Sequence, residues 1–413
     1  MRLRRSNPNL PGYTRRRRGR GFSYHDRTGA AIGDPTELAR IRALVIPPAW
    51  RKVWICPDPR GHIQAVGVDA AGRRQYRYHD VWRAQRDAAK FDHVLEVGAG
   101  LPKVREVVAE HIQERGLSRN RVLSAAVRLL DVGCFRIGGE EYASGDEATF
   151  GLATLRREHV ALVRGAVRFC YPAKGGMERT LDIHDDEVRA VIRALQKRDP
   201  GQAELLAYRT GSGWCDVRSA DINGYLREVS GIDISAKDFR TWNGTVLAAV
   251  VLAVDELEAA ARAARKADRR ATPTAGRSVD ARRRAVGRAM REVAEYLGNT
   301  PAVAKASYVD PRVVDLFADG ITIGPVLAEL GGAPTPEDAV AQHAVEAAVL
   351  EMLHTGEEPE DRGGRTSGAA CPVPTDPVRP CHHRYRTGIR TRRRAVTYRP
   401  ERRVGAGWCR DGG

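Results

Sequence analysis

The chain has 413 residues, and its hydrophobic content of 42% is enough for two ordinary cores with tails. Lysine and arginine total 68 against 52 aspartates and glutamates, which gives a formal net charge of +16. An excess of this size indicates a polyanionic partner. The longest apolar run, residues 246–254, is too short to cross a membrane, so we expect a buried helix there and no membrane partner.

Cysteine usage and the N-terminus indicate the compartment. The seven cysteines are scattered without a repeated spacing, which argues against a disulfide framework and favours a reducing compartment. Eight arginines stand in the first 20 residues, but no apolar segment follows them, so we expect no secretory signal. The predicted location is the cytoplasm.

Changes in composition divide the chain into four predicted segments. These are a basic, disordered arm (residues 1–21), a β-rich domain (22–96), a helical domain (97–332) and a low-complexity, largely disordered basic tail (333–413). In the β-rich domain, short strand-like runs at 53–55 and 62–68 flank a segment rich in proline and glycine, which predicts a hairpin. The expected fold class is α+β, with a small antiparallel sheet before a mainly α-helical domain.

The helical domain is recognised from apolar residues spaced i, i+3, i+4 over residues 101–113 and 118–133. Further helices are expected from about residues 185, 220, 241 and 284 onward. Residues 165–183 break this pattern and predict a hairpin with Lys174 at its tip.

Two sequence signals near the end of this domain predict short helices. Thr300-Pro301 and Asp310-Pro311 each place a capping residue before a proline at the first helical position. The first of these helices is expected to contain Tyr308.

Polar residues of the helical domain suit phosphodiester exchange. A tyrosine can attack a phosphodiester and later leave, so a covalent intermediate keeps the bond energy without ATP. Arginines suit the charged transition state, and a lysine can supply the proton that a departing 5′ oxygen needs. The candidates are Arg136, Lys174, Lys237, Arg240, Asn299 and Tyr308.

Taken singly, each candidate has an ordinary explanation, such as a solvated charge, helix packing or helix capping. Their order and contexts are more specific. Over residues 22–320 the chain resembles the compact type IB DNA topoisomerases of bacteria and poxviruses. The matching stretches are the segments around Arg136 and Lys174, residues 149–155, residues 237–242 and residues 299–311.

The resemblance implies a role for each candidate at a scissile phosphate. Tyr308 would form a 3′-phosphotyrosyl link, and Arg136 and Arg240 would clamp the phosphate. Lys174 would be the general acid for the 5′ oxygen, assisted by Arg136. Lys237 would support the site electrostatically.

Asn299 departs from the family pattern, because many relatives have histidine at this position. An amide can donate the same hydrogen bond to a non-bridging oxygen but cannot become cationic, so the contact is expected to be weaker.

DNA contacts are also implied outside the catalytic set. The β-rich domain contains a strand in which aromatic residues alternate with arginine, and it resembles a DNA-contacting segment of the family; an ordinary edge strand with a polar face explains it nearly as well. Tyr142 matches another DNA contact. The first segment supplies Gln75, Tyr76, Arg77 and Tyr78.

The resemblance implies duplex DNA as partner, held by a monomer that closes around it as a clamp. No cofactor is expected to be required, although Mg²⁺ can stimulate turnover. Cys371, Cys381, His382, His383 and Cys409 lack the paired spacing of a zinc site, so we expect no metal there.

Two other interpretations share part of this evidence. A tyrosine recombinase uses similar chemistry, but its second arginine box usually begins with histidine, where this chain has Lys237 three residues before Arg240. A non-catalytic basic DNA-binding protein would explain the charge but not the context of Tyr308. A metal-dependent nuclease is disfavoured, because no clustered pattern of aspartates and glutamates suits two metal ions.

Overall fold

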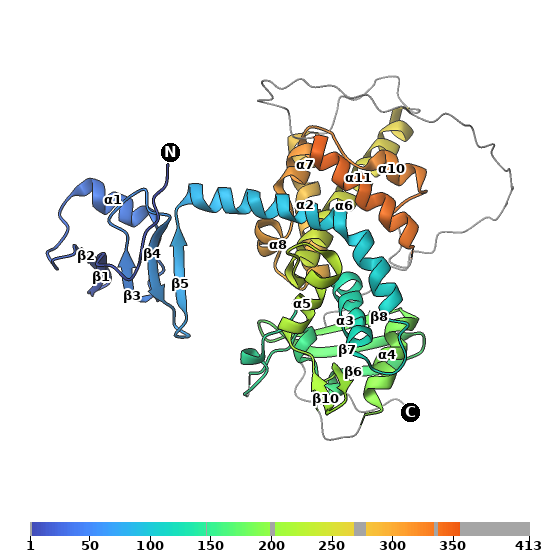
Figure 1. Cartoon of the computed structure of the whole chain (residues 1–413). Coiled ribbons are helices and arrows are strands. Elements are labelled where there is room, and N and C mark those ends of the chain that lie inside the picture. The colour runs from blue at the N-terminus through green and yellow to red at the C-terminus, as the bar shows by residue number, and fades with distance from the viewer. Residues whose placement is uncertain (1, 146, 199–202, 268–277, 334–337, 356–413) are drawn as a thin grey trace, which may run out of the picture. The chain divides into compact units, whose positions relative to one another are not determined.

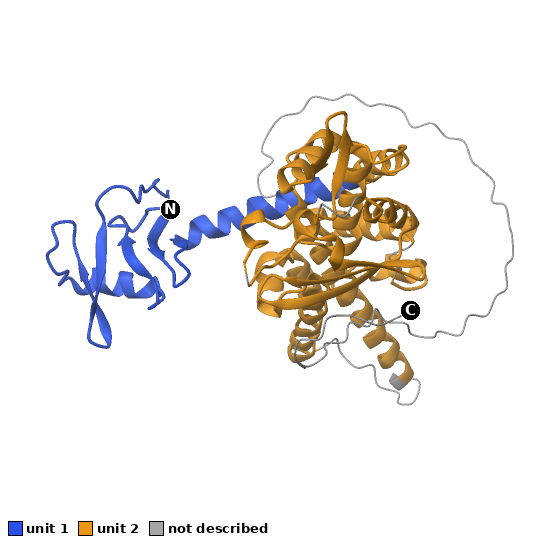
Figure 2. Ribbon diagram, turned by 90° about the horizontal axis from the view of Figure 1, so that it is seen from below, with its two compact units in different colours: residues 1–101 blue, residues 102–413 orange. Residues whose placement is uncertain are grey.

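The computed structural model describes residues 2–145, 147–198, 203–267, 278–333 and 338–355. The chain divides into two compact units, residues 1–101 and 102–413 (Figure 2). No helix among the described residues is long and apolar enough to span a membrane.

The N-terminal unit contains one antiparallel sheet in the order β2-β1-β3-β4-β5 (Figure 1). Its strands are β1 (Tyr13–Arg18), β2 (Gly21–His25), β3 (Arg51–Ile55), β4 (Ile63–Val68) and β5 (Arg74–Tyr78). Helix α1 (Pro35–Ala43) lies between β2 and β3 in the chain and begins at the capping residue Asp34. The predicted hairpin is the antiparallel pair of β3 and β4.

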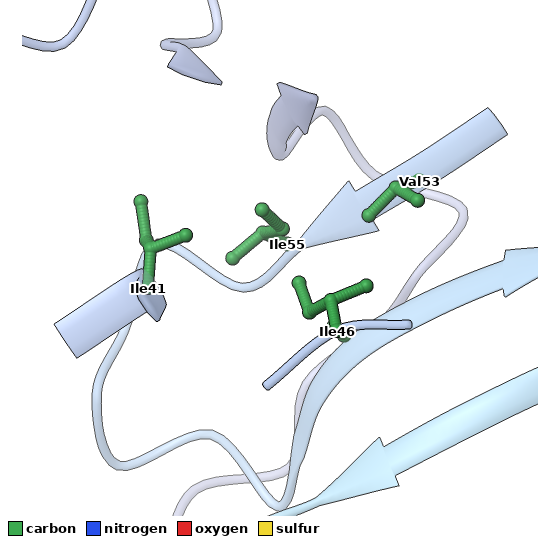
Figure 3. Packing of buried hydrophobic residues seen from close by; sticks show 5 residues of the cluster. Ile41, Ile46, Val53 and Ile55 are labelled. Carbon is green, nitrogen blue, oxygen red and sulfur yellow. The ribbon is translucent and has the colours of Figure 1, made fainter. Parts of the chain in front are cut away.

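The core of this unit is small and aliphatic. Ile41 from α1 packs with Ile46, Val53, Ile55 and Ala65, and all of them are buried (Figure 3). The alternating strand residues supply one apolar face, which the helix covers.

The structure corrects the prediction of a disordered N-terminal arm. Tyr13–Arg18 forms β1, which pairs with both β2 and β3. The charge run suggested a solvated segment, but Arg15 donates hydrogen bonds to the carbonyls of Ile46, Pro47 and Trp50 at 2.8–2.9 Å. Its guanidinium also lies 4.1 Å from the centre of the Phe22 ring, so this arginine is part of the folded unit.

The second unit is mainly helical. Its long helices are α2 (Asp80–His111, which begins in the first unit), α3 (Arg119–Gly133), α4 (Asp186–Gln196), α5 (Ser219–Ser230), α6 (Ala236–Ala267), α7 (Val279–Leu297) and α11 (Ala339–Thr355). The short helices are α8 (Pro301–Ser307), α9 (Pro311–Ala318) and α10 (Gly324–Glu329). Helix α3 is central, since it contacts α4, α5 and α6 and has most of its apolar residues buried.

In the described part of this unit, five strands accompany the helices. One sheet has the order β6-β7-β8, from Val160–Val163, Ala166–Ala173 and Met177–Ile183, and β9 (Ala207–Thr210) pairs with β10 (Gly213–Asp216). Helix α4 packs on β7, and α3 packs on β8 (Figure 1). The predicted hairpin is the pair of β7 and β8, with Lys174 in the turn between them.

Two predicted helix starts are confirmed. The Thr300 side chain accepts a hydrogen bond from the Val303 amide at the start of α8, and Asp310 accepts one from Arg312 at the start of α9. Tyr308, predicted inside α8, is instead the residue that ends it.

The predicted low-complexity tail begins too early. Residues 339–355 form α11, which packs on α6 and α10, so this part of the segment is folded. The arginine-rich residues 356–413 lie outside the described residues, as do the cysteines and histidines for which no metal is expected.

Candidate active site

The site is built where two helices end in left-handed turns. Helix α3 ends at Cys134 with φ 46°, and α7 ends at Gly298 with φ 60°. A left-handed residue turns the last carbonyls away from the helix axis, and the C-terminal dipole favours a cation there. Cys134 carries a side chain in this strained conformation, which costs about 1–2 kcal/mol and marks the turn as a special position.

Arg240 joins the two helix ends. It stands on α6, is only 3% exposed, and donates hydrogen bonds to the carbonyls of Cys134 and Leu297, the latter at 2.7 Å. Its Nε has no hydrogen-bond partner among the described residues. The guanidinium is therefore rigidly held with one donor still available.

Arg136 approaches the same place from the loop after α3. Its Nη2 donates to the carbonyl of Gly298 at 2.8 Å and to Oδ1 of Asn299. Burial, together with the charge of nearby Arg240, lowers the pKa of Arg136 to about 10. Two guanidinium groups are thus concentrated in a partly desolvated site.

Asn299 has its amide group oriented by Arg136. A guanidinium can only donate, so the amide oxygen must face it and the NH₂ group must point elsewhere. That NH₂ nitrogen is buried and has no hydrogen-bond partner in the described part of the chain. An unused buried donor is costly unless a ligand accepts from it.

Tyr308 lies against Arg240. The guanidinium carbon of Arg240 is 5.1 Å from the centre of the half-buried Tyr308 ring. The Tyr308 carbonyl accepts a hydrogen bond from Thr245 at 3.4 Å, and a Cβ added at Gly244 would lie 2.8 Å from the same oxygen. The absence of a side chain at Gly244 therefore lets the Tyr308 backbone approach α6.

A glycine contact supports the Arg136 loop. The carbonyl of Arg136 accepts from the Leu152 amide at 2.8 Å, and that of Ile137 accepts from Ala153 at 2.7 Å. A Cβ at Gly151 would lie 2.4 Å from the nitrogen of Gly138, so neither chain could approach this closely with larger residues. Residues 149–155 thus act as a brace for the loop.

The two lysines are not joined to this cluster. Lys174 is exposed at its hairpin tip, and Lys237 is exposed on the first turn of α6. Within the described ranges, neither ammonium group makes a hydrogen bond or an ion pair. The four residues that the structure brings together are Arg136, Arg240, Asn299 and Tyr308.

Sequence reasoning missed Arg179 on β8, which lies close to Arg136 in this cluster. The residue is 8% exposed, and its guanidinium donates to the carbonyl of Gly133 at 2.9 Å. In β8 it shares a face with half-buried Leu181 and buried Ile183, so a charged residue among apolar residues of one strand face was the available signal.

The cluster of three arginines has no acidic partner among the described residues. In the part of the chain that the structure describes, no ion pair involves Arg136, Arg179 or Arg240. Backbone carbonyls at helix ends offset some of the desolvation of these cations but do not neutralise them. The arrangement is suited to an anion with several oxygens, such as a phosphodiester.

Comparisons with known proteins agree with this chemistry. The family model of the eukaryotic DNA topoisomerase I catalytic core matches residues 79–318, more than half of the chain. The model of the bacterial DNA topoisomerase IB N-terminal domain matches residues 21–69. The chain belongs to the type IB DNA topoisomerases.

A curated relative supports the compact form of this family. The DNA topoisomerase 1B of Acanthamoeba polyphaga mimivirus is 26% identical over 311 residues, which cover 75% of this chain and 88% of the viral protein. The α+β fold of this topoisomerase, a five-stranded antiparallel sheet before a helical catalytic domain, is as predicted.

The N-terminal unit of the topoisomerase presents an aromatic edge. Tyr76 and Tyr78 are exposed on the edge strand β5, and their rings stack at 6.0 Å. Arg74, which sequence reasoning missed, shares this face and lies 5.7 Å from the Tyr76 ring centre. The alternation of side chains along a strand places these three together.

Gln75 and Arg77 lie on the other face of β5. Gln75 donates to Asp69 at 2.9 Å, and Arg77 donates to the carbonyl of Leu44 at 2.9 Å. The side-chain amide of Gln75 and the guanidinium of Arg77 therefore both form hydrogen bonds within the N-terminal unit. Tyr142 is 55% exposed on a single 3₁₀ turn, and its role as a DNA contact stays a prediction.

Proposed function

We propose that this type IB topoisomerase relaxes supercoiled duplex DNA without ATP by exchanging one phosphodiester for a 3′-phosphotyrosyl bond at Tyr308. The observation that carries the proposal is the contact of the Tyr308 ring with Arg240 beside Arg136 and the unused donor of Asn299. A nucleophile, a charge clamp and a free hydrogen-bond donor then meet in one site that holds no carboxylate partner for the arginines in the described residues.

In the forward step the Tyr308 oxygen attacks phosphorus and loses its proton to solvent. The bond from phosphorus to the 5′ oxygen breaks as the new P–O bond forms, and Lys174 gives a proton to the departing oxygen. Arg136, Arg240 and Asn299 stabilise the charge on the non-bridging oxygens. The reverse step has the same balance, so the strand is resealed with no energy source beyond the covalent bond.

We propose that the two lysines reach the scissile phosphate only when DNA is bound. Lys174 follows Ala173 in a turn with Gly175 and Gly176, both of positive φ, so its side chain extends from a tightly turned tip. Hydrogen bonds at catalytic sites often tighten only in the substrate complex. We assign Lys174 the general acid role and Lys237 an electrostatic one.

The wider arrangement is part of the same proposal. We propose that a monomer binds duplex DNA with both units, Tyr76, Tyr78 and Tyr142 among the contacts, and that it works in association with the nucleoid. No metal is required, since fixed cations at the phosphate supply the charge that Mg²⁺ provides elsewhere.

Relaxation of plasmid DNA of both supercoil signs, without ATP and in excess EDTA, tests the proposal. We expect both signs to be relaxed, because rotation about an intact strand relieves either. Complete loss of activity in EDTA at moderate salt would contradict the metal-free chemistry.

A further inference from the structure

Arg179 holds the three residues that precede Arg136. Its Nη2 donates to the carbonyl of Gly133 at 2.9 Å, and its Nη1 donates to that of Cys134 at 3.5 Å. Its guanidinium carbon lies 5.7 Å from the centre of the Phe135 ring. A single side chain thus contacts the whole turn that leads from α3 into the catalytic loop.

The same arginine belongs to the hairpin that carries Lys174. Arg179 is paired with Tyr171 in the ladder of β7 and β8, two residues before β7 ends at Ala173. Tyr171 is buried, and its ring lies nearly parallel to that of Phe135, at 6.1 Å and 14°. Arg179 therefore fixes the hairpin to the turn close to the general acid.

The turn also serves Arg240. The carbonyl of Cys134 accepts from both Arg179 and Arg240, so the two guanidinium groups share one acceptor. Arg240 of the phosphate clamp and Arg179 of the hairpin are therefore connected through one backbone carbonyl, that of Cys134.

Stability alone gives a poor reason for this arginine. Arg179 is a buried cation close to two others and has no carboxylate partner among the described residues, which is unfavourable. An apolar residue of similar length would fill the space at lower electrostatic cost. A functional requirement explains why the charge is kept.

We propose that Arg179 is a positioning residue that fixes the Lys174 hairpin relative to Arg136 and Arg240, the two arginines of the phosphate clamp. The inference rests on the proposed strand-exchange reaction. Without the hydrogen bonds of Arg179, both Lys174 and the two clamp arginines are misplaced, and a displacement of about 1 Å can lower the cleavage rate roughly 10²-fold.

The test compares single-turnover cleavage on two suicide substrates, one normal and one with sulfur in place of the bridging 5′ oxygen. A thiolate leaves without a proton, so sulfur removes the need for the acid but not for the clamp. On this substrate Lys174→Ala should recover almost fully and Arg240→Ala should not. The wild-type enzyme distinguishes a failure of the proposed function from a failure of the Arg179 inference. If the wild type forms no covalent adduct, the proposed function itself is refuted.

Arg179→Met is expected to cleave the normal substrate roughly 10²-fold more slowly, with an unchanged fraction of active enzyme and unchanged non-covalent DNA binding. Sulfur should restore only part of the loss, because both groups are misplaced. Arg179→Lys, which keeps the charge but can reach one carbonyl, should lie between this variant and wild type and serves if the methionine variant does not fold. The control is Arg168→Met, which removes an arginine of the same hairpin that pairs with exposed Asp182, and it should cleave at the wild-type rate.

Four results would overturn the proposal. They are a wild-type rate for Arg179→Met, a reduced active fraction at an unchanged rate constant, complete recovery on sulfur, and no recovery on sulfur. The second would show a merely structural role, and the last two would show that only one of the two groups depends on Arg179.

Discussion

At the residue scale, Gly244 on α6 packs directly against the backbone of the nucleophile Tyr308. A Cβ there would lie 2.8 Å from the Tyr308 carbonyl oxygen and 3.3 Å from the Tyr308 Cβ. Backbone atoms cannot move aside as a flexible side chain can, so a methyl group must displace the tyrosine.

Gly244→Ala is therefore expected to slow covalent complex formation by roughly 10²-fold while DNA binding persists. Helix propensity favours the alanine by about 1 kcal/mol, so global stability should change little. The matched control is Gly224→Ala on α5, where no described atom beyond the adjacent residues and the local helix backbone lies within 4 Å of the added Cβ. Equal cleavage rates for the two variants would refute the close-approach argument.

The sequence could supply the chemistry of these residues but not all of their contacts. Arg136, Arg240, Asn299 and Tyr308 were predicted from order and context, and the structure places them together. Their roles stay predictions. No sequence motif marks Gly244 or Arg179. Their importance depends on contacts that form only when α6 and β8 pack against the site.

At the element scale, α11 is attached to the catalytic unit by a buried ionic cluster. Arg105 on α2 donates to Asp131 on α3 at 2.8 Å and to Glu346 on α11 at 2.6 Å. Burial lowers the pKa of Arg105, but hydrogen bonds to Glu346 and Asp131 outweigh it and raise that pKa above its ordinary value. Asp131 stands three residues before Cys134, so the cluster braces the end of α3.

Glu346→Ala should lower the free energy of unfolding by about 2 kcal/mol, since Arg105 keeps only one of its two carboxylate partners. Thermal unfolding measures the change. Glu351→Ala removes an exposed carboxylate from the same helix and should leave the Tm almost unchanged. Similar Tm values for both variants would show that the cluster does not stabilise α11.

Helix caps and strand pairs are local, and for that reason the sequence predicted the hairpins and the starts of α8 and α9. The wrong predictions concern segments whose charged or polar composition was taken as a sign of disorder. The arginine run of β1 suggested a solvated arm, although Arg15 has its donors satisfied by backbone carbonyls. Helix α11 was assigned to the tail because a change to polar composition was treated as the end of the fold.

At the scale of the whole molecule, net charge and its distribution set DNA affinity. The C-terminal segment from residue 357 contains a run of arginines suited to phosphate contacts without sequence readout. They are Arg384, Arg386, Arg390, Arg392, Arg393 and Arg394.

Ending the chain at residue 356 should weaken DNA binding and make it less sensitive to salt. The slope of affinity against salt concentration, both as logarithms, should fall by about one for each phosphate that the shortened protein no longer binds. Single-turnover cleavage at saturating enzyme should not change. Binding at several salt concentrations measures the slope. A well-folded truncated protein without cleavage activity would place the tail in the active site instead.

The most direct test of the account is to locate the covalent bond to DNA. The protein is incubated with a duplex that traps the cleaved strand, then denatured and digested, and the peptide carrying the nucleotide is sequenced by mass spectrometry. The account predicts a 3′-phosphate ester on Tyr308 alone among the twelve tyrosines, and no adduct with Tyr308→Phe. An adduct on another residue, a 5′ linkage, or an adduct formed by Tyr308→Phe would contradict it.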